Sequence, residues 1–330
     1  MNTVVANAFA RMALGSAQIH RNIAVFPLLG LDAGPAPYLT LSEAMAERCI
    51  IVTEVSKSGS VPELRVVSQS DRPILLIDGE ELIGAKQNRV LNTTILLKEK
   101  AETIIPVSCV EQGRWSYASA EFVSSNTVMS STIRMLKLRS VSEALDAEGQ
   151  FRADQGRVWH EIECLQRCAG VTSATGAMQD VFRALSDDLA ACERTFMPVA
   201  GQTGIIVVID GNVAGLDAVA HADAYAKLHT KLIRSYLIDA LIKSKTEPLD
   251  ATKATATAQG FLQAVVDSRE KSFPSIGYGT DYRYQKPGIA GSALVHEERL
   301  VHMAFFRMPE SESANSAMAS FQHRRRRFFE

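Results

Sequence analysis

The hydrophobic pattern of the chain changes near residue 131, and this change limits the folds that it can adopt. From 22 to about 117, apolar residues form short runs separated by Gly, Pro, Asp, Ser or Lys-rich turns. Short runs at this spacing predict an antiparallel β-sandwich or barrel-like part. The predicted strands are Ala24–Leu29, Ile50–Val55, Leu64–Val67, Ile74–Ile77, Thr93–Leu97 and Thr103–Val110. A short helix is expected at Ser42–Arg48, because Thr40 and Glu43 form a capping-box pattern.

From 131 to 194 the apolar residues recur every three or four positions, which predicts central helices. Gly170 is a natural end for one of them, and Thr175 is placed to cap the next. A buried strand is then expected at Ile205–Ile209, and Asp210-Gly211 is typical of a tight hairpin turn after it.

The pattern of the last third of the chain predicts a C-terminal α/β part with hairpins. An apolar stripe from Tyr225 to Leu241 indicates a helix with one face toward the core. Lys243–Ala258 is polar and is interpreted as a linker, whereas Ser292–His296 and Leu300–Phe306 predict a closing hairpin. The fold class is therefore α+β.

With 330 residues, of which 46% are hydrophobic, the chain can form about two cores at ~150 residues per domain. We predict a β-rich domain at 20–125 that carries the polar motifs and a helical and α/β domain at 126–308. Residues 309–330 are expected to be a flexible basic tail that contains Arg324–Arg327.

Charge and cysteine usage limit the partners. The formal net charge of −2 gives no overall attraction to nucleic acid. No apolar run approaches the ~18 residues of a membrane span, and Arg11 interrupts the region where a signal peptide would need apolar residues. Five scattered cysteines are an odd number and are expected to be reduced thiols. The prediction is a cytoplasmic protein without a membrane or nucleic-acid partner.

The first candidate site is Asp78–Arg89, which directly follows a very apolar strand. Lys86 and Arg89 are suited to hold a phosphate or carboxylate. Gln87 and Asn88 can hydrogen-bond a sugar or a polar ring. Glu80 or Glu81 remains as a base. The alternative interpretation is a surface turn in which these groups form salt bridges with one another.

The second candidate site is Val107–Trp115. In an extended strand Cys109 and Glu111 share one face, and Glu111 would raise the pKa of the thiol. A small buried cysteine is therefore favoured over a nucleophile. Arg114 and Trp115 are suited to bind a ligand by charge and stacking.

Motifs for cofactors and metals are weak. Cys164 and Cys168 lie one helical turn apart, but no second pair with ligand spacing completes a zinc site. No Walker loop and no Gly-x-Ser-x-Gly motif occurs. Neither a metal nor a cofactor is expected.

Several motifs together resemble the ARG- and rhodanese-phosphatase-superfamily-associated protein domain family, in which ARG means ADP-ribosylglycohydrolase. The similarity runs from about Asn22 to Phe306. The motifs that carry it are Gly79–Arg89, Pro106–Trp115, Asp154–Trp159, Gly176–Met178 and Gly215–Asp217. The resemblance implies a ligand related to ADP-ribose or NAD.

The functional hypothesis is binding, with hydrolysis as the candidate reaction, of a phosphorylated ribose-containing small molecule. Lys86 and Arg89 would hold phosphate, Gln87 and Asn88 would orient the sugar or base, and Arg114 and Trp115 would complete the binding site. Glu80, Glu81 and Glu111 are the candidate catalytic residues. The alternative is a non-catalytic homo-oligomeric scaffold or partner-recruiting protein whose polar motifs join subunits.

Overall fold

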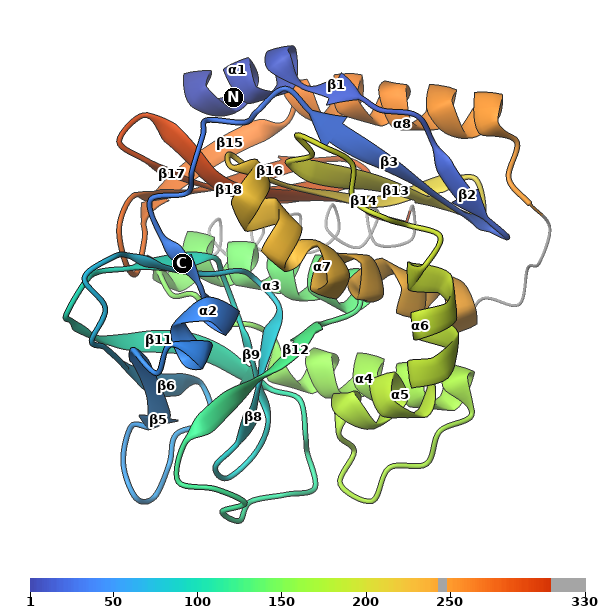
Figure 1. The fold of residues 1–330 in the computed structure, drawn as a ribbon. Helices are drawn as coiled ribbons and strands as arrows, with labels where there is room; N and C mark the ends of the chain where they lie inside the picture. The colour runs from blue at the N-terminus through green and yellow to red at the C-terminus, as the bar shows by residue number, and fades with distance from the viewer. Residues whose placement is uncertain (243–247, 310–330) are drawn as a thin grey trace, which may run out of the picture.

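A computed structural model describes residues 1–242 and 248–309 (Figure 1). The chain forms helices and mainly antiparallel sheets, with β4 and β7 as a parallel pair, so the predicted α+β class is confirmed. The predicted basic tail, from residue 310 onward, lies outside the described residues. The helices are α1 (Thr3–Arg11), α2 (Leu41–Ala46), α3 (Ser131–Glu148), α4 (Gln155–Ala169), α5 (Met178–Ala184), α6 (Ser186–Glu193), α7 (Ala222–Ile242) and α8 (Ala251–Val266).

The larger sheet combines strands from both ends of the chain. Its order is β1-β3-β13-β14-β18-β17-β16-β15, with β2 beside β3, and all pairs are antiparallel. Its strands are β1 (Ala13–Leu14), β2 (Gln18–His20), β3 (Ile23–Leu29), β13 (Gly204–Ile209), β14 (Asn212–Val219), β15 (Arg269–Pro274), β16 (Thr280–Lys286), β17 (Ile289–His296) and β18 (Arg299–Arg307). β3 belongs by sequence to the predicted β-rich domain 20–125, but it pairs with β13 in the larger sheet. The division into domains at 20–125 and 126–308 stays a prediction.

Helices cover both faces of this sheet (Figure 1). Alternate residues of β13 separate the two cores: Ile206 and Val208 belong to the cluster that includes α1 and α8, whereas Val207 packs with α3 and α7. Because both faces are covered, every residue of β13 is buried, which explains its uninterrupted apolar sequence.

The β-rich unit lies below α3 and α7 in Figure 1 and forms two smaller sheets. One has the order β12-β8-β9-β11-β6-β5 and the other β10-β7-β4. Their strands are β4 (Leu39–Thr40), β5 (Ile50–Glu54), β6 (Glu63–Ser68), β7 (Ile74–Leu76), β8 (Glu80–Gly84), β9 (Arg89–Leu91), β10 (Ile95–Leu97), β11 (Glu102–Cys109) and β12 (Phe122–Val128). The predicted capping box opens α2: Thr40 accepts from the Glu43 backbone, and the Glu43 carboxylate accepts from the Thr40 backbone.

The central helices confirm one predicted boundary and correct another. α4 ends at Gly170, which has a positive φ of 65° and serves as its C-cap. The prediction that Thr175 caps the next helix is wrong, because α5 begins after Ala177 without a side-chain cap. The hydroxyl of Thr175 instead donates to Glu111.

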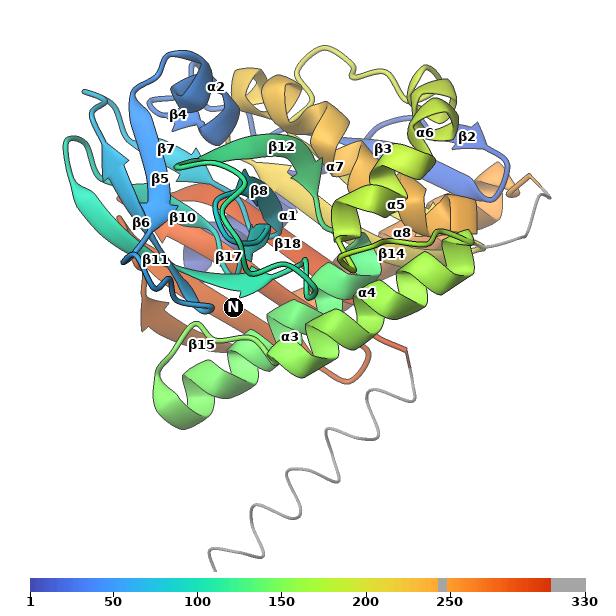
Figure 2. The ribbon, with the colours of Figure 1, turned by 90° about the horizontal axis from the view of Figure 1, so that it is seen from below.

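Two hairpins are confirmed, and the linker prediction is wrong in its second half. Asp210 and Gly211 turn β13 into β14 with φ values of 52° and 80°. Glu297 and Glu298 join β17 to β18. Within the predicted linker 243–258, however, α8 begins at Ala251. Figure 2 shows the β-rich unit on one side and α4 to α6 on the other, with α3 between them and the larger sheet.

A group of buried charges joins α3 to both sheets; we call Asp78, Arg134, Lys137, Asp217 and His302 the α3 cluster. The side chains of Arg134 and Asp217 are fully buried and form a two-pronged ion pair at 2.7 and 3.0 Å. Lys137 bonds Asp78 at the end of β7. Burial would raise the pKa of Asp217, but Arg134 and His302 hold it far below its usual range. The cluster therefore fixes the β-rich unit to the larger sheet.

Candidate functional site

The two polar stretches meet in the structure. β9 lies between β8 and β11, and Cys109 is directly opposite Arg89 across the β9–β11 pair. The loop 85–88 therefore lies against the segment 110–115, and the backbone of Val110 donates to the carbonyl of Asn88.

The carboxylate of Glu111 is the centre of a hydrogen-bond network. It accepts from the Asn88 backbone at 3.1 Å, from Arg114 Nη2 at 2.6 Å and from the Thr175 hydroxyl at 2.9 Å. Burial alone would raise the pKa of Glu111, but these three donors hold it below its usual value. Glu111 is therefore an ionised anchor for the surrounding loops.

Three more of the predicted residues belong to this network. Arg114 also donates to the Asn88 side chain at 3.1 Å and to the carbonyls of Gly84 and Ala85. Gln87 donates to the Glu111 carbonyl at 3.1 Å and accepts from Arg89 Nη1 at 2.8 Å. These side chains hold one another in place, and their hydrogen bonds join the two polar stretches.

Arg89 differs from its neighbours because two nitrogens of its guanidinium group make no hydrogen bond to an oxygen in the described chain. The residue is fully buried, yet its Nε and Nη2 have no hydrogen-bond partner in the described parts of the chain. These two atoms form the side edge with which arginine holds a carboxylate or phosphate in bidentate fashion. Burial lowers the pKa of Arg89, and the nearby Cys109 and Glu54 oppose this effect.

Lys86 and Trp115 lie next to Arg89. The Trp115 ring centre is 5.6 Å from Arg89 Cζ and 5.1 Å from Lys86 Nζ, and 47% of this tryptophan is exposed. Lys86 Nζ also donates to the Ser58 carbonyl at 2.7 Å. Gly59 lets the β5–β6 loop approach, because a Cβ at this position would meet Lys86, Glu54 and Trp115 at 3.1–3.3 Å.

Glu54, at the end of β5, completes this group. Its Oε1 accepts from the Lys86 backbone at 3.3 Å, and its Oε2 is buried without a hydrogen-bond partner within residues 1–242 and 248–309. We call Glu54, Lys86, Arg89, Cys109 and Trp115 the Arg89 cluster. Glu54 was not among the sequence candidates, since it lies 32 positions before Lys86 and only the folding of the sheet brings it here.

The two glutamates of β8 lie apart from the Arg89 cluster. Glu80 is bonded by Lys231 at 2.6 Å and by the Ile77 backbone at 2.8 Å, so both of its oxygens are used. Glu81 pairs across the strands with Val90, whereas Leu82 pairs with Arg89. Because side chains alternate along a strand, this register places Glu81 and Arg89 on opposite faces.

Glu81 is a buried acid. It has no exposed surface, and neither carboxyl oxygen has a hydrogen-bond partner among the residues that the structure covers. Burial raises the pKa of Glu81 to about 8, and the neighbouring Ser125 and Arg183 offset only part of this effect. Glu81 is therefore mostly protonated at neutral pH.

Cys109 is buried, as the sequence analysis favoured, and burial raises the pKa of its thiol. The side chain of Gln155 bonds both the N–H and the C=O of Cys109 at 2.8 Å. β6 pairs with β11 only as far as Pro106, so Gln155 of α4 replaces the missing strand partner. Trp159 lies one turn further along α4, beside the thiol, where it opposes the effect of burial on the thiol pKa.

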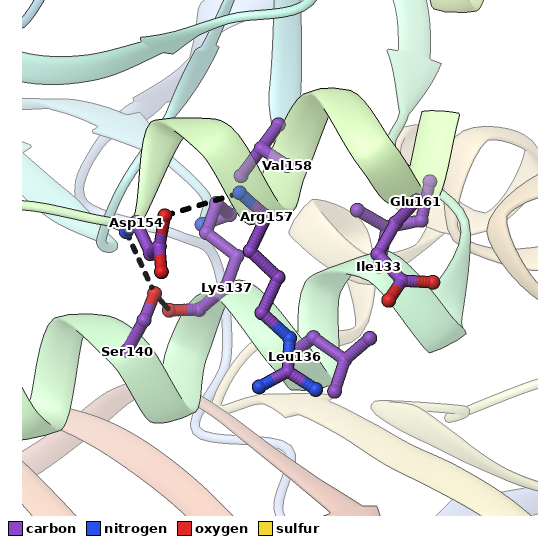
Figure 3. A pocket seen from close by; sticks show the side chains of 8 residues that line it. All are labelled: Ile133, Leu136, Lys137, Ser140, Asp154, Arg157, Val158 and Glu161. Carbon is purple, nitrogen blue, oxygen red and sulfur yellow. Dashed lines mark hydrogen bonds between the residues drawn. The ribbon is translucent and has the colours of Figure 1, made fainter. Parts of the chain in front are cut away.

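Two cavities lie between α3 and α4; Gln155, which bonds Cys109, lines the larger, and Lys137, which bonds Asp78, lines the smaller. The larger, of about 590 Å³, is lined by charged and small side chains that include Arg139, Glu143 and Arg152. The smaller is a narrow gap, seen in Figure 3, in which Asp154 bonds Ser140 and the backbone of Arg157. None of the predicted site residues lines either one.

In the described residues, no group of three or more His, Cys, Asp or Glu side chains is arranged to hold a metal ion. The same residues contain no helix that is long and apolar enough to cross a membrane. The five cysteines are free thiols.

The model of one protein family, described as the ARG and Rhodanese-Phosphatase-superfamily-associated Protein domain, matches residues 11–306. The chain belongs to this family. The match covers both polar stretches and Trp159, and it confirms the resemblance inferred from their motifs. No curated protein and no solved structure is significantly similar to the chain.

Proposed function

We propose that the chain binds a phosphorylated, ribose-containing small molecule, such as ADP-ribose or an NAD-related metabolite, at the Arg89 cluster. The observation that carries the proposal is the buried Nε–Nη2 edge of Arg89, which has no oxygen acceptor in the described chain and lies beside the weakly accepting thiol of Cys109. A buried charged donor without an acceptor is unfavourable unless a ligand supplies one.

The other members of the cluster suit the remaining parts of such a ligand. Lys86 adds a second positive charge beside Arg89. Carboxylates accept hydrogen bonds from ribose hydroxyls, which is a role open to Glu54 Oε2. The exposed ring of Trp115 offers a face on which a base can stack. Gln87 and Asn88 take a supporting role here, since they hold Arg89 and Arg114 in place.

The geometry favours binding over hydrolysis. Glu111 is held by three donors, both oxygens of Glu80 are bonded, and Glu81 faces away from Arg89. A hydrolytic role for Glu81 therefore requires a ligand that reaches around the β8–β9 pair. The family name associates these proteins with ADP-ribosylglycohydrolases, and this association supports the choice of ligand class.

Calorimetric titration with ADP-ribose, NAD and AMP tests the proposal. Replacement of Arg89 by Met removes two charged hydrogen bonds, so affinity should fall at least about tenfold. Arg65→Met is the matched control, because Arg65 lies on the same sheet with its side chain 43% exposed and pairs with Glu102. Absence of heat for every ligand with the wild-type protein, or equal affinities for both variants, would contradict the proposal.

A second candidate function is an oligomeric scaffold. Trp115 and Tyr117 are 47% and 53% exposed on neighbouring positions of one loop, as expected for a contact surface. Light scattering of the wild type and of Trp115→Ala separates the two functions. A closed oligomer that dissociates in the variant favours the scaffold, whereas a monomer that binds ADP-ribose favours the ligand site.

A further inference from the structure

We infer that the rings of Trp115 and Tyr117 form a gate over the Arg89 cluster, which is closed on Lys86 in this structure and is displaced when the ligand binds. The inference rests on the proposed function and adds to it the way in which the ligand enters. It also makes a prediction that needs no ligand: Lys86 should be shielded from reagents until the two rings are removed.

The charged groups of the Arg89 cluster are shielded from solvent. Arg89 has no exposed surface, and Glu54 and Lys86 are 7% and 9% exposed. A phosphate must come within hydrogen-bond distance of its donors, so a ligand cannot reach these side chains unless a covering group moves. Trp115 and Tyr117 are 47% and 53% exposed, and both lie over Lys86. These two rings are therefore the covering group that we expect to move.

Both rings lie against the ammonium group of Lys86. Its Nζ is 5.1 Å from the ring centre of Trp115 and 5.2 Å from that of Tyr117, which is the range of a cation–π contact. The Nζ also donates to the carbonyl of Ser58 at 2.7 Å, whereas the Tyr117 hydroxyl makes a long hydrogen bond of 3.4 Å to the carbonyl of Lys57. A charge-assisted hydrogen bond to phosphate is stronger than cation–π contacts at half-exposed rings, so an anionic ligand can replace them.

The backbone is fixed on both sides of the two rings. The N–H of Gly113 donates to the carbonyl of Thr175 at 2.7 Å, and the N–H of Ala118 donates to the carbonyl of Ala85 at 2.8 Å. Exposed side chains rotate much faster than loops rearrange. We therefore expect the gate to open by rotation of the two side chains, while the backbone of 113–118 stays in place.

The closed position of Trp115 is defined by packing against the β5–β6 loop. Gly59 has a φ of +77°, and a Cβ at this position would lie 3.3 Å from Trp115 Cζ2 and 3.1 Å from Lys86 Cδ. The indole edge therefore rests against the backbone of Gly59 and the stem of Lys86. Because almost half of Trp115 is exposed, the ring can turn outward and then meet the base of the ligand, which is its role in the proposed function.

Acetylation of lysine side chains in the absence of ligand tests the gate. The wild type and the double variant Trp115→Ala, Tyr117→Ala are treated with N-acetoxysuccinimide, and mass spectrometry of peptides measures the rate at Lys86. If at most ~10% of the molecules are open, removal of both rings should raise this rate by about tenfold or more. The exposed Lys253 on α8 should react equally in both proteins. Val123→Ala, at an exposed apolar position on β12, is the matched control and should leave the rate at Lys86 unchanged.

Tyr117→Ala separates the gate from the ligand contacts. In the proposed function Trp115 stacks on the base, whereas Tyr117 covers Lys86 and holds no part of the ligand. Calorimetric titration with ADP-ribose should therefore show an affinity about threefold to tenfold higher for the variant than for the wild type, because a larger fraction of its molecules is already open. Val123→Ala should bind ADP-ribose with the affinity of the wild type.

The outcomes separate this inference from the proposed function. Equal rates at Lys86 in the wild type and the double variant overturn the inference, whether or not a nucleotide binds. An affinity of Tyr117→Ala for ADP-ribose that equals or falls below that of the wild type also overturns it, although the binding itself then supports the proposed function. A faster reaction of Lys86 in the double variant, without nucleotide binding to any of the proteins, supports the gate and contradicts the proposed function.

Discussion

The α3 cluster and the Arg89 cluster both contain a fully buried arginine, but the two arginines are satisfied differently. Arg134 has carboxylates of Asp217 and Asp78 within 4 Å. Arg89 bonds the side chain of Gln87 and the thiol of Cys109, and no ion pair with a carboxylate holds it within the described residues. One buried guanidinium thus has two carboxylates beside it, and the other has none within 4 Å in the described chain. We interpret the first as a structural contact between the sheets, and we propose that the second serves a ligand.

The largest effect should come from breaking the paired arginine. Arg134→Met removes the charge that lies between the buried carboxylates of Asp217 and Asp78, so we expect the free energy of unfolding to fall by about 3–5 kcal/mol. Urea denaturation measures this. Arg152→Met, which breaks the exposed pair with Glu148, is the control and should change stability by less than about 1 kcal/mol. Similar losses in both variants would show that the α3 cluster does not stabilise the fold.

Glu81→Gln tests a buried acid that, like Arg89, has no ion-pair partner within 4 Å in the described chain. The pKa of Glu81 is raised in the folded protein to about 8, from an ordinary value of 4.5. Its protonated form therefore favours folding at low pH, and this contribution is lost as the pH rises through about 8. The variant should be close to the wild type near pH 5 and exceed its stability at pH 9, by about 5 kcal/mol at most.

Melting curves of both proteins at pH 5 and pH 9 test this expectation. Glu121→Gln, at an exposed position, is the control, and its stability relative to the wild type should not change between pH 5 and pH 9. If the difference in stability between the wild type and Glu81→Gln is the same at pH 5 and pH 9, Glu81 has an ordinary pKa.

The smallest effect on stability should come from the open arginine. Arg89→Met removes a buried charge that lacks an ion-pair partner in the described chain, at the expense of one hydrogen bond to Gln87. The free energy of unfolding should therefore change by less than about 1 kcal/mol or should increase. Urea denaturation without ligand measures this free energy. A loss as large as that of Arg134→Met would make Arg89 a structural residue.

The fold was predictable where one period of hydrophobicity dominates. The six strands predicted before residue 117 correspond to β3, β5, β6, β7, β10 and β11, and the hairpin at Asp210-Gly211 also follows from its pattern. β8 and β9 were not predicted, because the polar side chains of Asp78–Arg89 hide the strand pattern. α8 was missed because its buried face consists partly of alanines, Ala254 and Ala258, followed by Phe261 and Val265. Small side chains among Thr and Lys give a weak hydrophobic signal, although their spacing is helical.

For the site, the sequence indicated the residue types but not their arrangement. It marked Lys86, Arg89 and Trp115 as candidate binding residues, since they lie in two polar stretches that are close in the chain. It could not show that Glu81 faces away from Arg89, because a shift of one residue in the β8–β9 register reverses the faces. Glu54 and Trp159 come from distant segments, and only the tertiary fold brings them to Cys109 and Arg89.

The central claim is that the Nε–Nη2 edge of Arg89 serves a ligand's phosphate. A crystal structure of the protein with ADP-ribose tests it most directly. We expect phosphate oxygens within hydrogen-bond distance, about 2.7–3.2 Å, of both Nε and Nη2. A structure in which ADP-ribose binds elsewhere, or in which a protein group occupies this edge of Arg89, would contradict it.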